Sequence, residues 1–184
     1  MKHMLLRLPP GFHLYLAVAF CIVFSGSALG QQKTVPSAES RERTTVAQRF
    51  ATERLAVWQQ RLNLQDWNIS VVASHPSDLK PRTLGNIHWD SDKKTAVVRF
   101  LDPADYKIPF DDVLKDIEFT VVHELIHLEL SPVLSALQRN DANRREEEHA
   151  VNHMAEALLE LDRANRAAKA SEAAPIANAP VPQK

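Results

Sequence analysis

Two histidines four positions apart, His123 and His127, have the type and spacing to do chemistry. On an α-helix, positions i and i+4 lie only about 40° apart around the axis and roughly 6 Å apart along it, so both imidazole rings can reach one ion. Glu124 points about 100° away from His123, too far round to be a third ligand but within reach of a water molecule on that ion. The pattern therefore predicts a metal site with Glu124 as general base.

The segment that carries these residues must be a largely buried helix. Its apolar residues recur with the 3.6-residue period over 111–130, and the second half is apolar nearly all round. We expect this helix to begin at Asp111 or Asp112 and to end at Ser131, because Pro132 cannot continue the backbone ladder. One narrow polar stripe should face a cleft: Asp116, Thr120, His123 and His127.

The run Thr-Val-Val-His-Glu-Leu-Ile-His-Leu at 120–128 resembles the active-site helix of the HExxH zinc metallopeptidases, the zincins. Glu129 departs from that family's pattern, which prefers an apolar residue there. The resemblance implies a zinc-dependent endopeptidase acting on a peptide or protein. In such an enzyme Zn²⁺ lowers the pKa of a bound water, and Glu124 takes its proton as the water attacks a peptide carbonyl.

A catalytic zinc needs a third protein ligand, which must come from the last predicted helix, 143–163. Glu147 and Glu148 both project toward the apolar stripe of that helix, and its geometry slightly favours Glu147. The run 148–155 is similar to the third-ligand helix of minimal gluzincins, including the phage-associated repressor-cleaving peptidases. On that similarity we predict Glu148 as the ligand, with Glu147 as the alternative and Asn152 orienting a ligand. An acidic first turn favoured by the helix dipole would explain both glutamates without a metal.

The rest of the sequence predicts a small α+β domain over 44–165. A helix should begin at Thr44 or Thr45 and end near Leu64, followed by strands at 67–73, 86–89 and 95–101, the last two forming a hairpin. The expected layout is that of a minimal zincin: an N-terminal helix, a small three-stranded, mostly antiparallel sheet, the HExxH helix and a returning C-terminal helix. We expect residues 95–101 to form an exposed strand edge that could align an extended peptide.

Composition narrows the function classes. The chain has 184 residues, 45% of them hydrophobic, and a net charge of −1, so no basic excess argues for a nucleic-acid partner. Its one cysteine, Cys21, excludes a disulfide framework and cysteine zinc ligands. One domain fits this length, and we expect a monomer.

The two ends of the chain differ from the domain in composition. Residues 1–30 combine a positive start, an apolar run and a small-x-small site, which predicts a signal peptide and a periplasmic or secreted protein. The alternatives are an uncleaved membrane anchor formed by residues 12–29 and a true start further downstream. We expect residues 31–43 to be a linker and the Ala- and Pro-rich residues 166–184 to be a disordered tail.

Two other functions are compatible with this pattern. One is a non-catalytic zinc-binding interaction module of the cell envelope, although the intact HExxH pentad argues against lost catalysis. The other is an envelope structural protein in which the histidines are incidental. For the peptidase, the group that stabilises the oxyanion is unassigned, and the candidates are Tyr106, His75 and His88.

Overall fold

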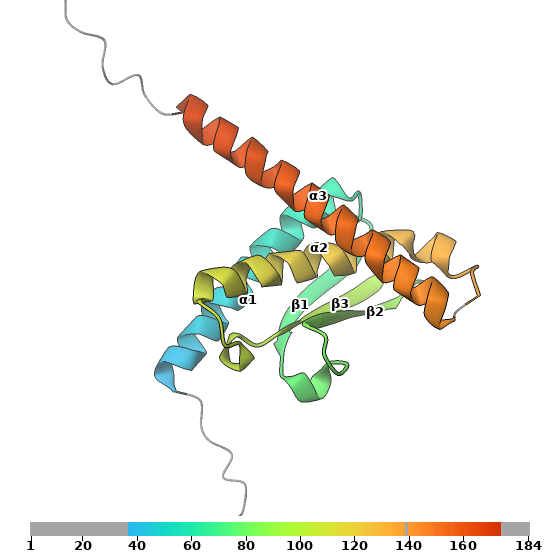
Figure 1. The fold of residues 1–184 in the computed structure, drawn as a ribbon, viewed down its shortest axis with the longest axis horizontal. Helices are drawn as coiled ribbons and strands as arrows, with labels where there is room; N and C mark the ends of the chain where they lie inside the picture. Colours follow the sequence, from blue (N-terminus) through green and yellow to red (C-terminus); the bar gives the residue numbers. More distant parts are fainter. Residues whose placement is uncertain (1–36, 139, 174–184) are drawn as a thin grey trace, which may run out of the picture. The chain divides into compact units, whose positions relative to one another are not determined.

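The fold begins with a helix, continues through three short strands, and ends with two long helices (Figure 1). The computed structural model describes residues 37–138 and 140–173, so the expectations for residues 1–30 and for the end of the tail lie outside the described residues. Its α+β class and the order of its elements are as predicted. The helices and strands are α1 (Ala38–Arg61), β1 (Asn68–Ser74), β2 (Gly85–Asp90), β3 (Thr95–Leu101), α2 (Phe110–Leu134) and α3 (Asp141–Ala173), with short 3₁₀ turns at Pro76–Asp78 and Pro103–Asp105.

The sheet is mixed, with the strand order β1-β3-β2. Strands β2 and β3 form the predicted antiparallel hairpin, in which Ile87 pairs with Val98. Strand β1 pairs with β3 in parallel, so only one of the two pairings is antiparallel, where mostly antiparallel pairing was expected. The prediction that residues 95–101 form an exposed strand edge is wrong, because β3 is hydrogen-bonded to a strand on each side. Alternating apolar residues identify a strand but not its neighbours, and the edge strand of this hairpin is β2.

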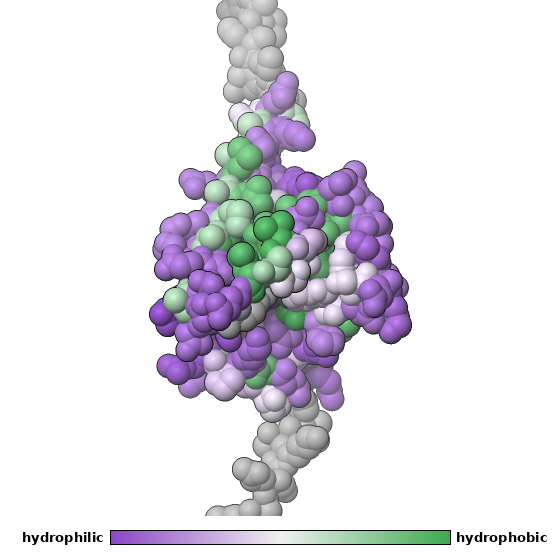
Figure 2. All heavy atoms as spheres, turned by 90° about the vertical axis from the view of Figure 1, so that its right-hand side faces the viewer, coloured by the Kyte–Doolittle hydropathy of each residue, from purple (hydrophilic) through white to green (hydrophobic). Residues whose placement is uncertain are grey.

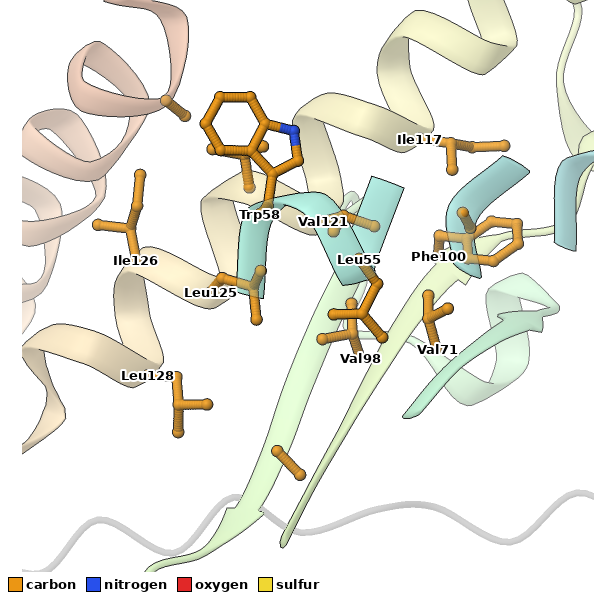
Figure 3. Packing of buried hydrophobic residues seen from close by; sticks show 14 of the residues in the cluster. Leu55, Trp58, Val71, Val98, Phe100, Ile117, Val121, Leu125, Ile126 and Leu128 are labelled. Carbon is orange, nitrogen blue, oxygen red and sulfur yellow. The ribbon is translucent and has the colours of Figure 1, made fainter. Parts of the chain in front are cut away.

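Helices α1 and α2 pack on one face of the sheet, and their buried side chains form the core with it. Figure 3 shows Leu55 of α1, Val121 of α2 and Val98 of β3 within this cluster. Helix α3 adds its own buried stripe to the core: Val151, Ala155 and Leu159. Residues of β1 that point to the other face, such as Ser70 and Val72, are exposed. The helices of residues 37–138 and 140–173 thus cover one face of the sheet, and α2 lies between the sheet and α3.

Helix α1 begins earlier than predicted. Ser37 is its N-cap, and the Ser37 side chain accepts a hydrogen bond of 3.0 Å from the Ser40 amide. The predicted cap Thr44 lies inside the helix, where its hydroxyl donates to Asp102 at 3.0 Å. Residues 38–43 therefore belong to the helix and not to a linker, since alanine, glutamate and arginine favour helix once a cap precedes them.

Helix α2 starts at Phe110, slightly before the predicted caps, and it passes through Pro132 to Leu134. The prediction that Pro132 ends the helix is wrong. Proline lacks one amide donor, but its fixed φ suits a helix, and this proline lies in the last turn. The ladder resumes at once, because the Ser135 amide donates to Ser131 at 2.9 Å.

Helix α3 continues past the predicted end at Arg163 to Ala173, so the first part of the expected tail is helical. Its last ten residues contain neither glycine nor proline, and alanine, lysine and glutamate sustain a helix well. Although α3 is 33 residues long, its sequence is polar on most sides. Within the described part of the chain no helix has the length and apolarity needed to cross a membrane.

Candidate metal centre

Helix α2 turns His123 and His127 toward the first turns of α3. Their Nε2 atoms lie 3.1 Å apart, and the side chains are only 13% and 11% exposed. Glu148 approaches from α3, with its Oε2 atom 3.3 Å from His123 Nε2 and 3.6 Å from His127 Nε2. Three potential ligand atoms from two helices therefore converge on one point.

The size of this triangle fits a tetrahedral metal ion. Zinc binds imidazole nitrogen and carboxylate oxygen at about 2.0–2.2 Å, and a tetrahedral angle then puts ligand atoms about 3.3 Å from each other. The observed edges of 3.1, 3.3 and 3.6 Å match that spacing. Hydrogen bonding accounts for the triangle less well, because a carboxylate only accepts and each neutral imidazole offers one proton at most. The donor set leaves a fourth position for water or substrate.

Glu147 has a different place from Glu148. Its Oε1 atom lies 3.0 Å from His127 Nδ1, and its side chain is 10% exposed. A proton on Nδ1 donated to this carboxylate would leave the Nε2 lone pair free for the ion. Both glutamates turn toward α2, and although the Glu148 side chain is 46% exposed, it is Glu148 that reaches both Nε2 atoms. Glu147 fits the role of holding His127 in the orientation that binds metal.

His123 is kept in the form that a metal needs. Burial and then the adjacent His127 lower the pKa of His123, while Glu148 and Asn152 push it upward by smaller amounts. The ring is therefore neutral at neutral pH, which is the form that ligates. Asn152, predicted to orient a ligand, lies near enough to this ring to raise its pKa. Among residues 37–138 and 140–173, His123 Nδ1 is nevertheless one of few buried side-chain polar atoms with no hydrogen-bond partner of good geometry.

Glu124 lies beside the triangle and is buried, with 8% of its surface exposed. Burial and the neighbouring Glu148 raise the pKa of Glu124 to about 7, against opposing effects from the Lys80 charge and a hydrogen bond from the Ile87 amide. A carboxyl group that titrates near neutrality can both accept and return a proton. Its position and its pKa thus suit the predicted role of general base.

A pocket of about 590 Å³ opens in front of these residues, a volume in the range of ligand sites. Figure 2 shows the side of the molecule on which α2 ends and α3 begins, where hydrophobic residues gather inside a hydrophilic surround. The lining combines His123, His127 and Glu148, which we call the metal triangle, with other residues of α2, β2, the segment before β2 and the first turn of α3: Lys80, Thr83, Leu84, Gly85, Asn86, Ile87, Trp89, Phe119, Thr120, His123, Glu124, His127, Arg144 and Glu148.

Strand β2 presents a main-chain edge to this pocket. The Leu101 amide donates to the Leu84 carbonyl at 2.8 Å, which fixes the alternation of the hairpin's hydrogen bonds. The main-chain groups of every second residue, beginning with Gly85, must then point away from β3. These residues are Gly85, Ile87 and Trp89, and all three line the pocket. The edge able to pair with an extended chain therefore belongs to β2 and runs beside Glu124.

Gly85 lets this edge approach the helix. A Cβ atom there would lie 2.5 Å from the Arg99 carbonyl oxygen and would clash with the Thr120 methyl group. Only glycine fits at this crossing of β2 and α2. The sequence marks Gly85 as the residue before a strand, but the need for close approach becomes visible only when α2 is packed on the sheet.

The proposed oxyanion candidates lie outside the pocket lining. The Tyr106 hydroxyl is buried without a hydrogen-bond partner in the described residues, and burial, helped by Asp116, raises the pKa of Tyr106 to about 12. His75 bonds to Asp105 at 2.9 Å, and His88 is exposed. Two cations that sequence reasoning did not single out, Lys80 and Arg144, line the pocket instead. No pattern around them in the sequence signals this role.

Comparisons of the chain with protein-family models, with curated proteins and with solved structures found no match. The likeness of residues 120–128 to the zincin active-site helix is therefore a likeness of one short segment. What the protein does has to be inferred from the chemistry of its own residues.

Proposed function

We propose that this protein is a zinc-dependent endopeptidase. The observation that carries the proposal is the convergence of His123, His127 and Glu148 on one point at the wall of a pocket, with Glu124 beside them. Two imidazoles and one carboxylate are the ligand set of many catalytic zinc sites, which keep one coordination position open. A site with a structural role would fill that position with a fourth side chain.

Zn²⁺ held by these three residues would supply a Lewis acid for a peptide carbonyl and would acidify a water molecule. The protein's own contribution to the reaction is proton transfer. As the water oxygen bonds to the carbonyl carbon, a Glu124 carboxylate oxygen accepts a proton from it. Glu124 then gives that proton to the amide nitrogen as the C–N bond breaks, so the products are an amine and a carboxylic acid, whose remaining proton then passes to the amine. The pKa of about 7 suits both halves of the exchange.

The edge of β2 offers a way to hold the substrate. An extended peptide can pair with the main-chain groups of Gly85 and Trp89, and with the Ile87 carbonyl, since the Ile87 amide is engaged by Glu124. Pairing there would run the peptide past the metal triangle. Main-chain pairing would fix the position of the scissile bond, and it depends little on the side chains of the substrate.

The test compares two substitutions on the same helix. Glu124→Gln removes the base and keeps the shape, so we expect one zinc ion per chain and a loss of about 100- to 10,000-fold in cleavage of quenched peptides. Glu129→Gln is the control, because Glu129 is exposed on α2. Zinc is measured by mass spectrometry and cleavage by fluorescence. Full activity of Glu124→Gln, or a wild-type protein without zinc, would overturn the proposal. Zinc without any cleavage would favour the non-catalytic interaction module.

A further inference from the structure

Two positive side chains line the pocket. Lys80 lies in the segment before β2, and Arg144 lies in the first turn of α3. Neither forms a salt bridge with another described residue. The acids of the pocket are already in use, since Glu148 points at the histidines and Glu124 is the proposed base. The lining thus contains cationic groups that its own residues do not neutralise.

Both cations lie close to the place where a substrate would react. The positive charge of Lys80 lowers the pKa of Glu124. Arg144 is one helical turn before Glu148, on the same face of α3, where the two would ordinarily pair. Glu148 instead turns to His123 and His127. Arg144 therefore stays available to a ligand beside the third metal ligand.

The charge balance of the pocket then determines which peptides fit. With a divalent ion on the triangle, positive charge in the lining exceeds negative charge. In a cleft of this kind a carboxylate gains a partner, while a lysine or arginine of the substrate is repelled. Lys80 and Arg144 are themselves exposed, so a pair that either of them forms with a substrate carboxylate should weaken as the salt concentration rises.

We infer that the site selects acidic peptides, those with an aspartate or glutamate beside the scissile bond, and that Lys80 and Arg144 recognise that carboxylate. The inference rests on the proposed peptidase function and adds the substrate class to it. Arg145 and Lys107 provide controls, because both are exposed cations of the same kinds and neither lines the pocket.

The first test measures the binding of peptides to a variant that cannot cleave them. A fluorescent peptide containing glutamates, and its counterpart with glutamine in their place, are titrated into the full-length zinc-loaded Glu124→Gln protein, and anisotropy is measured. We expect the acidic peptide to bind about tenfold more tightly, and the gap to narrow as NaCl rises from 50 to 500 mM. Adding Lys80→Ala and Arg144→Ala should abolish most of the gap, and adding Lys107→Ala and Arg145→Ala should preserve it. Because all these variants keep the ion, the difference measures the two cations alone.

Turnover separates this inference from the proposed function. On the otherwise unchanged enzyme, kcat/KM should favour the glutamate peptide, and Lys80→Ala with Arg144→Ala should lower it several-fold more for that peptide than for the glutamine peptide. Equal cleavage and equal binding of the two peptides would overturn the inference and leave the peptidase standing. An equal loss on both peptides would also overturn it, since Lys80 or Arg144 would then act in the reaction. Failure to cleave any peptide would contradict the peptidase itself. Thermal unfolding checks that each variant is folded.

Discussion

Helix α2 takes part in two buried polar clusters, and only one of them is complete. At Glu118, Arg54 and Trp58 of α1 both donate to the carboxylate, the indole at 3.2 Å. Nearby, Asp162 of α3 is bound by three arginines, Arg54, Arg61 and Arg166, at 2.9, 2.7 and 2.9 Å. This arginine cluster, as we call Glu118, Asp162 and their partners, joins all three helices. Each buried acid has its cation within the chain.

The second cluster is the metal triangle, five residues further along α2. There the side chains direct lone pairs at one point, and no lysine or arginine ion pair reaches that point among the described residues. The pKa shifts of Asp162 and Glu124 show how the two clusters differ. Burial alone would raise the pKa of Asp162, but the Arg61 hydrogen bond and the charges of Arg166 and Arg54 outweigh burial and lower it. Glu124 lacks comparable partners, and its pKa is raised to about 7. The arginine cluster is neutralised within the chain, whereas the metal triangle would be completed by the ion that we propose.

The largest expected effect is the loss of the ion. His127→Ala removes one of three ligands, so we expect zinc affinity to fall at least about a thousandfold and peptide cleavage to disappear. With EDTA present, stability toward urea should fall modestly, because the substitution also removes the hydrogen bond between His127 Nδ1 and Glu147.

His149→Ala is the matched control for that prediction. His149 and His153 have the same four-residue spacing on α3, with ring centroids 4.1 Å apart, but they are exposed. Competition titration with a zinc chelator measures the affinity of each variant. If His149→Ala lowered the affinity for zinc as much as His127→Ala does, the ion would not be bound at the metal triangle. The contrast drawn between the two clusters would then be wrong.

The next largest effect concerns the arginine cluster. Glu118→Ala leaves a charged Arg54 and the Trp58 indole without one buried acceptor, and removing one partner of a buried pair typically costs 3–5 kcal/mol. Since Arg54 keeps Asp162, we expect the lower end, about 3 kcal/mol of unfolding free energy, by urea titration. Zinc stoichiometry should remain one. Glu129→Ala on the exposed face of α2 should cost under about 0.5 kcal/mol. If Glu118→Ala left the stability unchanged but removed zinc, the arginine cluster would be the one needed for the ion, and our assignment of roles to the two clusters would be wrong.

The two clusters also differ in how far the sequence predicts them. The pentad at 123–127 lies within one helical turn, so local periodicity is enough to bring its histidines together. Glu118 and Asp162 are far from Arg54 in the sequence, and their pairing depends on how α1 and α3 pack against α2. A single acid in an amphipathic helix is ordinarily assigned to the exposed face, and nothing local contradicts that for Glu118. Local patterns therefore predict the approach of the two histidines better than they predict the arginine cluster.

The same limit explains the errors in the fold. The bounds of β3 agree with the prediction, because its alternation is regular over 95–101. Its central place does not follow from alternation, and the edge strand was consequently expected in the wrong position. On α3, periodicity turns both Glu147 and Glu148 inward. Which of them reaches the histidines depends on the rotation of α3 against α2, a tertiary quantity.

The smallest expected effect tests Glu147, which holds a ligand without being one. Glu147→Gln keeps the size of the side chain but weakens the acceptor 3.0 Å from His127 Nδ1, so His127 should lose basicity and some of its fixed orientation. We expect zinc affinity to fall about 10- to 100-fold, with stoichiometry still one at high zinc. Glu146→Gln, one residue earlier and exposed, should leave the affinity unchanged. If Glu147→Gln abolished zinc binding while Glu148→Gln only weakened it, the two glutamates would have exchanged roles, with Glu147 the ligand of the triangle.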